Sequence, residues 1–96
     1  MLNYEGKKFL ITGGTGSLGI ALTKRLLDLG AETIRILSRN ESKQLVMESE
    51  IASDRVRFLI GDVRDLPRLK KALQGIDIVF HAAALKHVNI IEYNPF

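Results

Sequence analysis

The stretch KKFLITGGTGSLGIALTKRLLDLG, residues 7–30, decides the fold of this chain. It opens with an apolar run, residues 7–12, that is typical of a buried parallel strand. Glycines follow at once, and from Ser17 to about Leu29 the leucines recur at helical spacing. Gly30 then stands where helices usually end. The stretch therefore predicts a strand, a glycine loop and a helix in direct succession.

The same alternation continues along the chain. It predicts further strands at residues 33–37, 55–60 and 77–83. It also predicts one helix that begins at Asn40 or Ser42 and reaches about Ser53, and another at residues 65–74. Asp65 is the expected N-cap of the last helix, with Pro67 in its first turn and one apolar face made of Leu66, Leu69 and Leu73. After Val88 the sequence resembles the beginning of another helix or a turn. Helices between strands over such short distances imply right-handed crossovers and a parallel sheet.

The predicted fold class is α/β, a Rossmann-type parallel sheet in its N-terminal half only, with four strands in the order 3-2-1-4. Its most apolar strand, residues 77–83, would lie at an open edge, and such an edge favours pairing with another chain. We therefore expect residues 1–96 to be the N-terminal part of an NAD(P)-binding domain, truncated before the catalytic and substrate-binding segments. We also expect a homo-oligomer, and self-association or marginal folding of this part alone.

Composition is that of a soluble globular protein with one modest core. The 96 residues are 46% apolar and 26% charged, and they contain no cysteine, which excludes a disulfide framework, a thiolate zinc site and a cysteine nucleophile. The net charge of +3 is scattered in pairs with few aromatic residues, which argues against a nucleic-acid partner. No signal-peptide layout or membrane-length apolar run is present, so we expect a cytoplasmic protein without a membrane partner.

The glycine loop, TGGTGSLG at residues 12–19, is suited to hold a pyrophosphate. A pyrophosphate needs backbone N–H donors and the positive end of a helix dipole. Two glycines would allow a tight turn and close approach, and a third would let the helix pack on the strand. Because this Gly-x-Gly-x-x-Gly follows a strand and opens a helix, it predicts dinucleotide binding rather than a merely structural turn. The residues expected to take part are Gly13, Thr15, Gly16, Ser17, Leu18 and Gly19.

The end of the second strand selects the cofactor. An acidic residue about 20 positions after the loop would bind the ribose 2′-hydroxyl of NAD, but residues 37–40 read LSRN and carry none. Ser38 and the Arg39 guanidinium suit a phosphate instead, and Lys43 adds charge one turn later. We therefore predict NADP in preference to NAD. The alternative is that Arg39 and Lys43 are ordinary solvated charges.

Two further segments follow strands at the same edge of the sheet. Asp62 could accept a hydrogen bond from the adenine amino group while Val63 packs on the ring, although a turn before the Asp65 cap would also explain this pair. The small residues Ala82, Ala83 and Ala84 would leave room for the nicotinamide ribose, and close packing against a helix is their alternative explanation.

These motifs together resemble the extended short-chain dehydrogenase/reductase family. The run VFHAAALKHV at residues 79–88, followed by EYNP at 92–95, is similar to nucleotide-sugar 4,6-dehydratases of polysaccharide and flagellin-glycan biosynthesis, especially the inverting UDP-N-acetylglucosamine 4,6-dehydratases. Ser38-Arg39 and the segment GDVRD at 61–65 are similar to that group as well. Asn89 departs from the proline expected there.

The resemblance implies an NADP-dependent lyase with no net redox change. Hydride would pass from hexose C4 to NADP⁺, water would leave across C5 and C6, and hydride would return to C6. The family's catalytic tyrosine and lysine have no counterpart here. Tyr4 has a lysine at the Tyr-x-x-x-Lys spacing, Lys8, but Tyr4 precedes the first strand, and Tyr93 has no lysine after it. No catalytic residue is therefore assigned, and this part alone is expected to be inactive. Lys86 could orient the nucleotide-sugar substrate or be an ordinary surface lysine. His81 and His87 lack a third ligand nearby, which favours packed or hydrogen-bonded histidines over a metal site.

Two other functions stay open at this point. A nucleotide-sugar 4-epimerase or a simple reductase would share the glycine loop and the scaffold. A non-catalytic NADP-binding module would share the cofactor site without any turnover.

Overall fold

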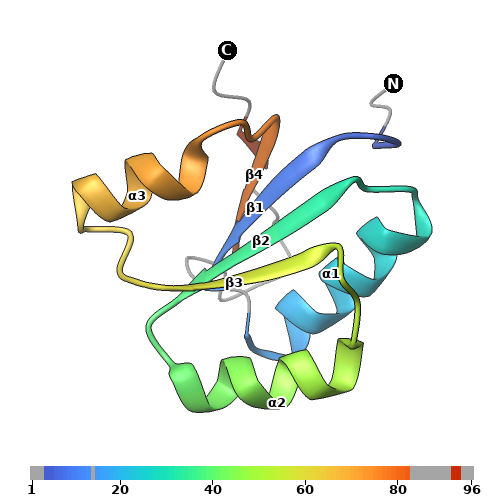
Figure 1. Cartoon of the computed structure of the whole chain (residues 1–96), viewed down its shortest axis with the longest axis horizontal. Helices are drawn as coiled ribbons and strands as arrows, with labels where there is room; N and C mark the ends of the chain where they lie inside the picture. Colours follow the sequence, from blue (N-terminus) through green and yellow to red (C-terminus); the bar gives the residue numbers. More distant parts are fainter. Residues whose placement is uncertain (1–3, 14, 83–91, 94–96) are drawn as a thin grey trace.

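A computed structural model of the chain describes residues 4–13, 15–82 and 92–93 (Figure 1). Strands and helices alternate as predicted, with small differences at their ends. Their bounds are β1 (Lys8–Thr12), α1 (Ser17–Asp28), β2 (Thr33–Ser38), α2 (Glu41–Ile51), β3 (Val56–Ile60), α3 (Leu66–Leu73), β4 (Ile78–His81) and β5 (Glu92–Tyr93).

Within the described residues the strands form one sheet in the order β3-β2-β1-β4-β5. Strands β1 to β4 are parallel, and Phe9 of β1 pairs with Ile34 on one side and Ile78 on the other. The predicted class and the order 3-2-1-4 are therefore confirmed.

The end of the sheet differs from the prediction. The short β5 pairs antiparallel with β4, placing Tyr93 opposite Val79, so β4 is not left open there and Tyr93 lies in a strand rather than a helix. The reason is that the backbone groups along the outer edge of β4 find partners when the chain folds back beside them. A strand of two residues is too short to show a periodicity, so no local pattern indicates it.

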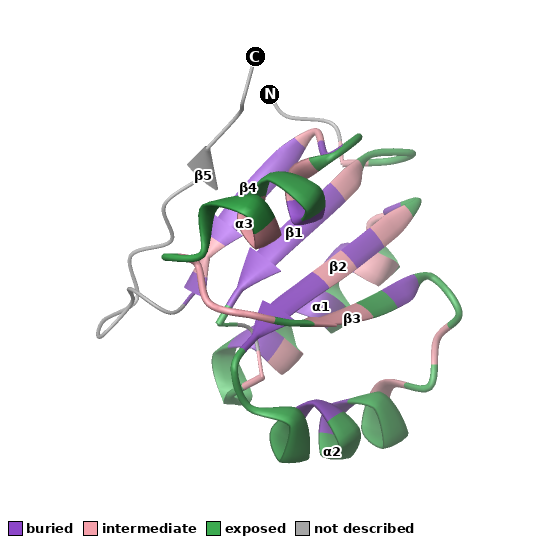
Figure 2. Cartoon of the chain, turned by 60° about the vertical axis from the view of Figure 1, so that its left-hand side comes forward, coloured by how far each residue is buried: buried purple, intermediate pink, exposed green. Residues whose placement is uncertain are grey.

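Apolar side chains cover both faces of the sheet, as a parallel sheet requires. Figure 1 shows α1 and α2 on one face and α3 on the other. Because successive residues of a strand point to opposite faces, Phe9 and Ile11 join the core beneath α1 and α2, whereas Leu10 joins the core beneath α3. Figure 2 shows the buried strands between helices whose outer faces are exposed.

The apolar faces of two helices are shorter than predicted. Leu18 is 37% exposed and Leu66 is 63% exposed, whereas Leu26, Leu69 and Leu73 pack into the two cores. Both exposed leucines lie in the first turn of their helix. Each of these helices begins near the edge of the sheet where the preceding strand ends. That edge is where the predicted site residues gather.

Candidate functional site

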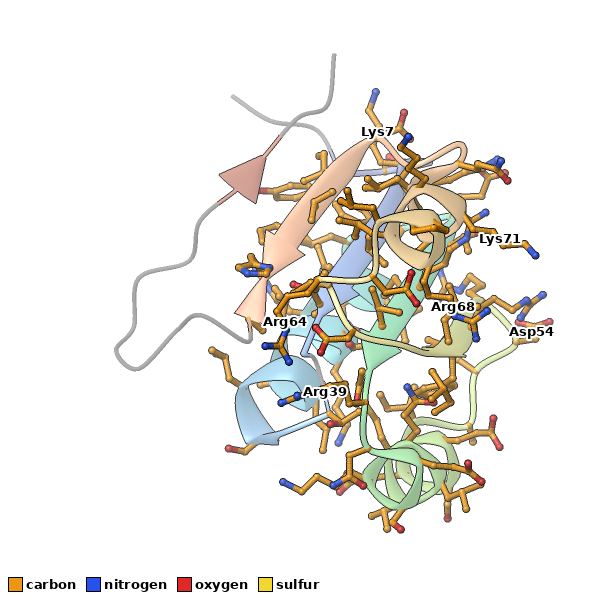
Figure 3. The ribbon with its side chains drawn as sticks, turned by 90° about the vertical axis from the view of Figure 1, so that its left-hand side faces the viewer. Lys7, Arg39, Asp54, Arg64, Arg68 and Lys71 are labelled. Atoms are coloured by element: carbon orange, nitrogen blue, oxygen red, sulfur yellow. The ribbon has the colours of Figure 1, made fainter. Side chains whose placement is uncertain are left out.

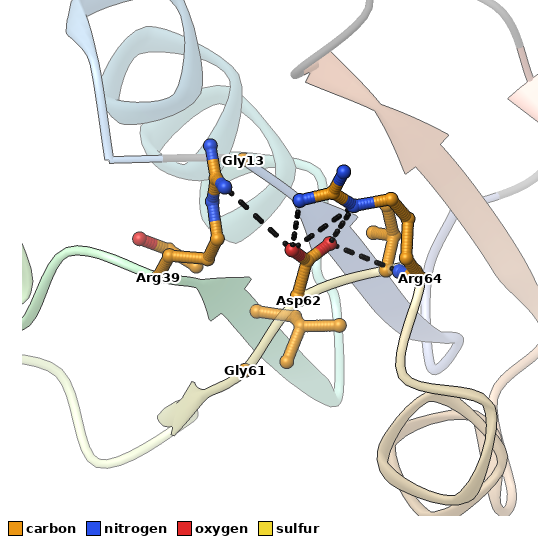
Figure 4. A pocket seen from close by; sticks show the side chains of 8 residues that line it. Gly13, Arg39, Gly61, Asp62 and Arg64 are labelled. Atoms are coloured by element: carbon orange, nitrogen blue, oxygen red, sulfur yellow. Dashed lines mark hydrogen bonds and ion pairs between the residues drawn. The ribbon is translucent and has the colours of Figure 1, made fainter.

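Backbone hydrogen bonds link the segments that follow β1 and β3 to the carboxyl end of β2, at one edge of the sheet. The Gly13 N–H donates to the Leu37 carbonyl oxygen at 2.7 Å, and the Gly61 N–H donates to the Ser38 carbonyl oxygen at 3.0 Å. Two adjoining hollows open there, of about 430 and 590 Å³, and both are lined by Gly13, Ser38 and Arg39. Figure 4 shows the first of them. Residues far apart in the sequence therefore meet around one site, as the parallel topology predicts.

Two described glycines of the loop, Gly13 and Gly16, have backbone features that favour anion binding. Gly13 has a φ of +67°, in the left-handed region that favours glycine. Gly16 is the N-cap of α1, and no side chain of the described residues caps this helix, whereas Asn40 and Asp65 cap α2 and α3. A Cβ at Gly16 would meet no described atom within 4 Å. Among the described residues, the start of α1 thus faces open space with backbone donors that no side chain takes.

The other predicted loop residues take different places. Gly19 is buried within α1, in agreement with a packing role, while Ser17 and Leu18 are exposed in the first turn. Thr15 lines the larger hollow, with its Oγ1 3.4 Å from the Ser38 Oγ.

Polar groups of β2 and the start of α2 line the larger hollow. The Ser38 Oγ accepts a hydrogen bond from the Asn40 N–H at 3.0 Å, and the Asn40 Oδ1 accepts one from the Lys43 N–H at 3.0 Å. The Arg39 side chain is 72% exposed, and Lys43 is exposed as well. Two cations therefore stand beside a hydroxyl group at the predicted 2′-phosphate position.

The smaller hollow is dominated by one carboxylate. Asp62 Oδ1 accepts from the Arg64 N–H at 2.9 Å, and its Oδ2 accepts from Arg64 Nη2 at 2.9 Å. Arg39 Nη1 approaches the same Oδ2 at 3.6 Å (Figure 4). The hydrogen bonds from Arg64, aided by the charges of Arg64 and Arg39, lower the pKa of Asp62 from 3.8 to about 2. Asp62 is therefore ionised at neutral pH. Val63 lines this hollow too.

Acid should release this carboxylate from its partners. The folded-state pKa lies below the unfolded value, so the contribution of Asp62 to stability is present above about pH 4 and is lost as the pH falls through about 2. An NMR titration of the Asp62 carboxyl group should give a midpoint of about 2. Arg64→Gln should raise that midpoint more than Arg39→Gln does, because hydrogen bonds from Arg64 are the main cause. A midpoint of about 3.8 in the wild type would contradict the contacts described here.

Sequence reasoning missed two residues of this edge. Gln44, which is 5% exposed, donates from Nε2 to the Leu59 carbonyl oxygen at 2.8 Å and thereby fixes α2 to β3. Arg64 binds Asp62 from two positions further along, a spacing at which Asp side chains commonly accept from the backbone. That spacing could have indicated the Arg64 N–H contact, whereas nothing in the pattern around Gln44 singles it out.

The end of β4 carries the remaining predictions. His81 Nδ1 is hydrogen-bonded to Thr12 Oγ1, which confirms a hydrogen-bonded histidine and links β4 to β1. Ala82 is 8% exposed and belongs to the core beneath α1 and α2, so its contacts are those of packing. The predicted Ala83, Ala84, Lys86 and His87 lie outside the described residues.

The described part of the chain holds neither a metal-ligand cluster nor a membrane-spanning helix. No three His, Asp or Glu side chains in it are grouped as a metal site would need. Among its helices, none combines the length and the apolar character needed to cross a membrane.

The sequence pattern of the polysaccharide biosynthesis protein family matches residues 9–96. The chain belongs to this family. It is 53% identical to an uncharacterized membrane protein of Methanocaldococcus jannaschii, 52% identical to an inverting UDP-N-acetylglucosamine 4,6-dehydratase of Campylobacter jejuni, and 45% identical to a UDP-glucose 4-epimerase of Rickettsia conorii. Each alignment covers 96% or 97% of this chain but 28% of the relative, so the chain spans less than a third of their length.

Solved structures share the fold. Pen from Bacillus thuringiensis has a TM-score of 0.81 and 38% identity over 91% of this chain and 27% of its own. An oxidoreductase of the short-chain dehydrogenase/reductase family from Burkholderia thailandensis has a TM-score of 0.68 and 28% identity, covering 77% and 30%. WbmF from Bordetella bronchiseptica, solved in complex with NAD⁺ and UDP, has a TM-score of 0.68 and 27% identity, covering 81% and 23%. The family resemblance predicted from the motifs is thus confirmed.

Proposed function

We propose that this chain is the cofactor-binding N-terminal part of an NADP-dependent nucleotide-sugar 4,6-dehydratase. One observation carries the proposal: a helix start that no described side chain caps, the Arg39 guanidinium and the Asp62 carboxylate share one edge of the sheet. The 52% identity with a UDP-N-acetylglucosamine 4,6-dehydratase supports the reaction class, and the NAD⁺ and UDP bound by WbmF support a nicotinamide dinucleotide and a nucleotide-sugar substrate. The choice of NADP rests on Ser38, Arg39 and Lys43.

The described residues fit a dinucleotide in three places. The pyrophosphate would lie on the backbone N–H groups at the start of α1, where Gly13 and Gly16 have no side chain to obstruct it. The 2′-phosphate would lie beside Ser38 and Arg39, with Lys43 adding charge. The adenine would enter the smaller hollow between Asp62 and Val63. When bound, the nicotinamide would supply a hydride acceptor and donor, and this chain's own part is to hold and orient it.

Arg39 should distinguish the two dinucleotides. Arg39→Ala is expected to weaken NADP⁺ binding by roughly 10- to 100-fold, because a charge-assisted hydrogen bond contributes about 1.5–3 kcal/mol. Binding of NAD⁺ should change by less than about threefold, since it has no 2′-phosphate. Isothermal titration calorimetry of the complete protein with each dinucleotide would measure both. Lys24→Ala, which removes an exposed cation in α1, is the matched control. An equal loss for NAD⁺ and NADP⁺ would remove Arg39 from phosphate recognition.

The reaction class can be tested on the complete protein with UDP-N-acetylglucosamine. A 4,6-dehydratase yields a 4-keto product that has lost one water, with no net use of cofactor. A 4-epimerase, the activity named for the Rickettsia conorii relative, yields an isomer of unchanged mass. A reductase consumes reduced cofactor, and a non-catalytic module binds the dinucleotide without turnover. Mass spectrometry together with nicotinamide absorbance separates these four outcomes, and only the first supports the proposal.

A further inference from the structure

The Asp62 carboxylate lies between two guanidinium groups that hold it unequally. Arg64 donates its backbone N–H and its Nη2, each at 2.9 Å, and its Nε at 3.2 Å. Arg39 makes a looser ion pair at 3.6 Å, beyond hydrogen-bond distance. Figure 4 shows the two arginines reaching the carboxylate from opposite sides. Arg64 is therefore the more tightly bound partner of the Asp62 carboxylate, and the Arg39 guanidinium can move away from it at little cost in free energy.

This arrangement places a negative charge beside the phosphate position. A carboxylate so close to Arg39 would compete with a 2′-phosphate for the guanidinium and would repel the phosphate itself. With its pKa at about 2, Asp62 keeps this charge at every pH at which the protein is expected to work. The charge must therefore be balanced by another cation when Arg39 turns to a phosphate.

We propose that Arg64 is a positioning residue for NADP recognition, which neutralises Asp62 and so frees Arg39 to bind the 2′-phosphate. The inference rests on the proposed function, because it requires a phosphorylated dinucleotide in this site. Arg64 acts through Asp62, and no contact between Arg64 and the phosphate is needed.

If the proposal is right, replacing Arg64 should lower the affinity for NADP⁺ more than the affinity for NAD⁺. In Arg64→Gln the Asp62 carboxylate is left with Arg39 as its remaining cation among the described residues, so NADP⁺ affinity should fall roughly tenfold. NAD⁺ affinity should change by less than about threefold, which also shows that the variant is folded. Arg64→Lys should lie between the two, since it keeps the charge but not the forked hydrogen bonds.

A double variant tests the role of the carboxylate. Asp62→Asn removes the charge that Arg64 balances, so Asp62→Asn with Arg64→Gln should recover the NADP⁺ to NAD⁺ affinity ratio of Asp62→Asn alone. Any effect of Asp62 on adenine binding applies to both dinucleotides and cancels in that ratio. Non-additivity of this kind is what a double-mutant cycle detects.

Arg68→Gln is the matched control. Arg68 is a cation of the same type, but it donates to the Ile60 carbonyl oxygen at 2.7 Å rather than to Asp62. Figure 3 shows Arg39 and Arg64 near each other and Arg68, a residue of α3, farther from both. Removing Arg68 should leave the affinity ratio within about threefold of the wild type, unless general loss of positive charge is what weakens NADP⁺ binding.

The titrations use the complete protein with NADP⁺ and NAD⁺. The positioning role is overturned if Arg64→Gln weakens both dinucleotides equally, if Arg68→Gln has the same effect on the ratio, or if the double variant does not recover it. An equal loss of affinity for both dinucleotides would mean that Arg64 only lines the hollow proposed for adenine. A wild type that prefers NAD⁺ would refute the proposed NADP preference, while the change of ratio in Arg64→Gln would still decide the role of Arg64. Binding of neither dinucleotide would overturn both.

Discussion

Replacing Phe9 with alanine is expected to lower the free energy of unfolding by about 3–5 kcal/mol, the usual range for removing a buried aromatic ring. Phe9 lies in the central strand β1 with no exposed surface. Its ring stacks on that of Phe80, with the ring centroids 6.0 Å apart, and its centroid lies 5.6 Å from the centroid of the Tyr4 ring. Packing on two sides means that the surrounding structure cannot easily close the cavity, so the loss should fall in the full range.

Urea denaturation followed by circular dichroism would measure this loss. Leu45→Ala is the matched control, because Leu45 is 61% exposed on α2 and alanine is at least as favourable in a helix. The control should change the unfolding free energy by less than about 0.5 kcal/mol. If the two variants were equally destabilised, Phe9 would not be the centre of the core beneath α1 and α2.

The order of elements can be predicted because each one has a local sequence signal. Asp65 is the expected cap of a helix with Pro67 in its first turn, and Asp65 Oδ1 accepts from the Arg68 N–H at 3.3 Å. Helical spacing identifies α1 in the same way, although it overestimates the burial of Leu18. The pairing of β5 with β4 depends on a contact between distant segments, and local patterns do not contain that information.

The site can be predicted in outline for a topological reason. Parallel strands bring their carboxyl ends together, so Gly13, Arg39 and Asp62 must lie near one another once the strand order is known. The contacts among them cannot be predicted, because they depend on side-chain rotamers. The hydrogen bond from Arg64 to Asp62 is such a contact, and it changes the role that Asp62 can be given in the site. Asp62 is expected from the sequence to meet adenine, yet its oxygens also bind the arginines that line the hollow.

Replacing Gly13 with valine is expected to lower affinity for both NAD⁺ and NADP⁺ by about 100-fold or more. The φ of +67° costs a non-glycine residue roughly 1–2 kcal/mol, and a branched Cβ increases that strain. Relief of the strain would shift the Gly13 N–H from the Leu37 carbonyl oxygen and the loop from its position at the start of α1. Lost phosphate hydrogen bonds of about 1.5–3 kcal/mol then add to the strain.

Gly6→Val is the control that separates the effect of backbone strain from the effect of a change in the cofactor site. Gly6 has a φ of +72°, and a Cβ there would meet no described atom within 4 Å, but it precedes β1, at the opposite end of that strand from Gly13. The substitution should therefore cause similar backbone strain while leaving both dinucleotide affinities within about threefold of the wild type. Unlike Arg39→Ala, Gly13→Val should not discriminate between NAD⁺ and NADP⁺, since the pyrophosphate is common to both. Native affinity in the Gly13 variant would mean that the pyrophosphate does not lie on this loop.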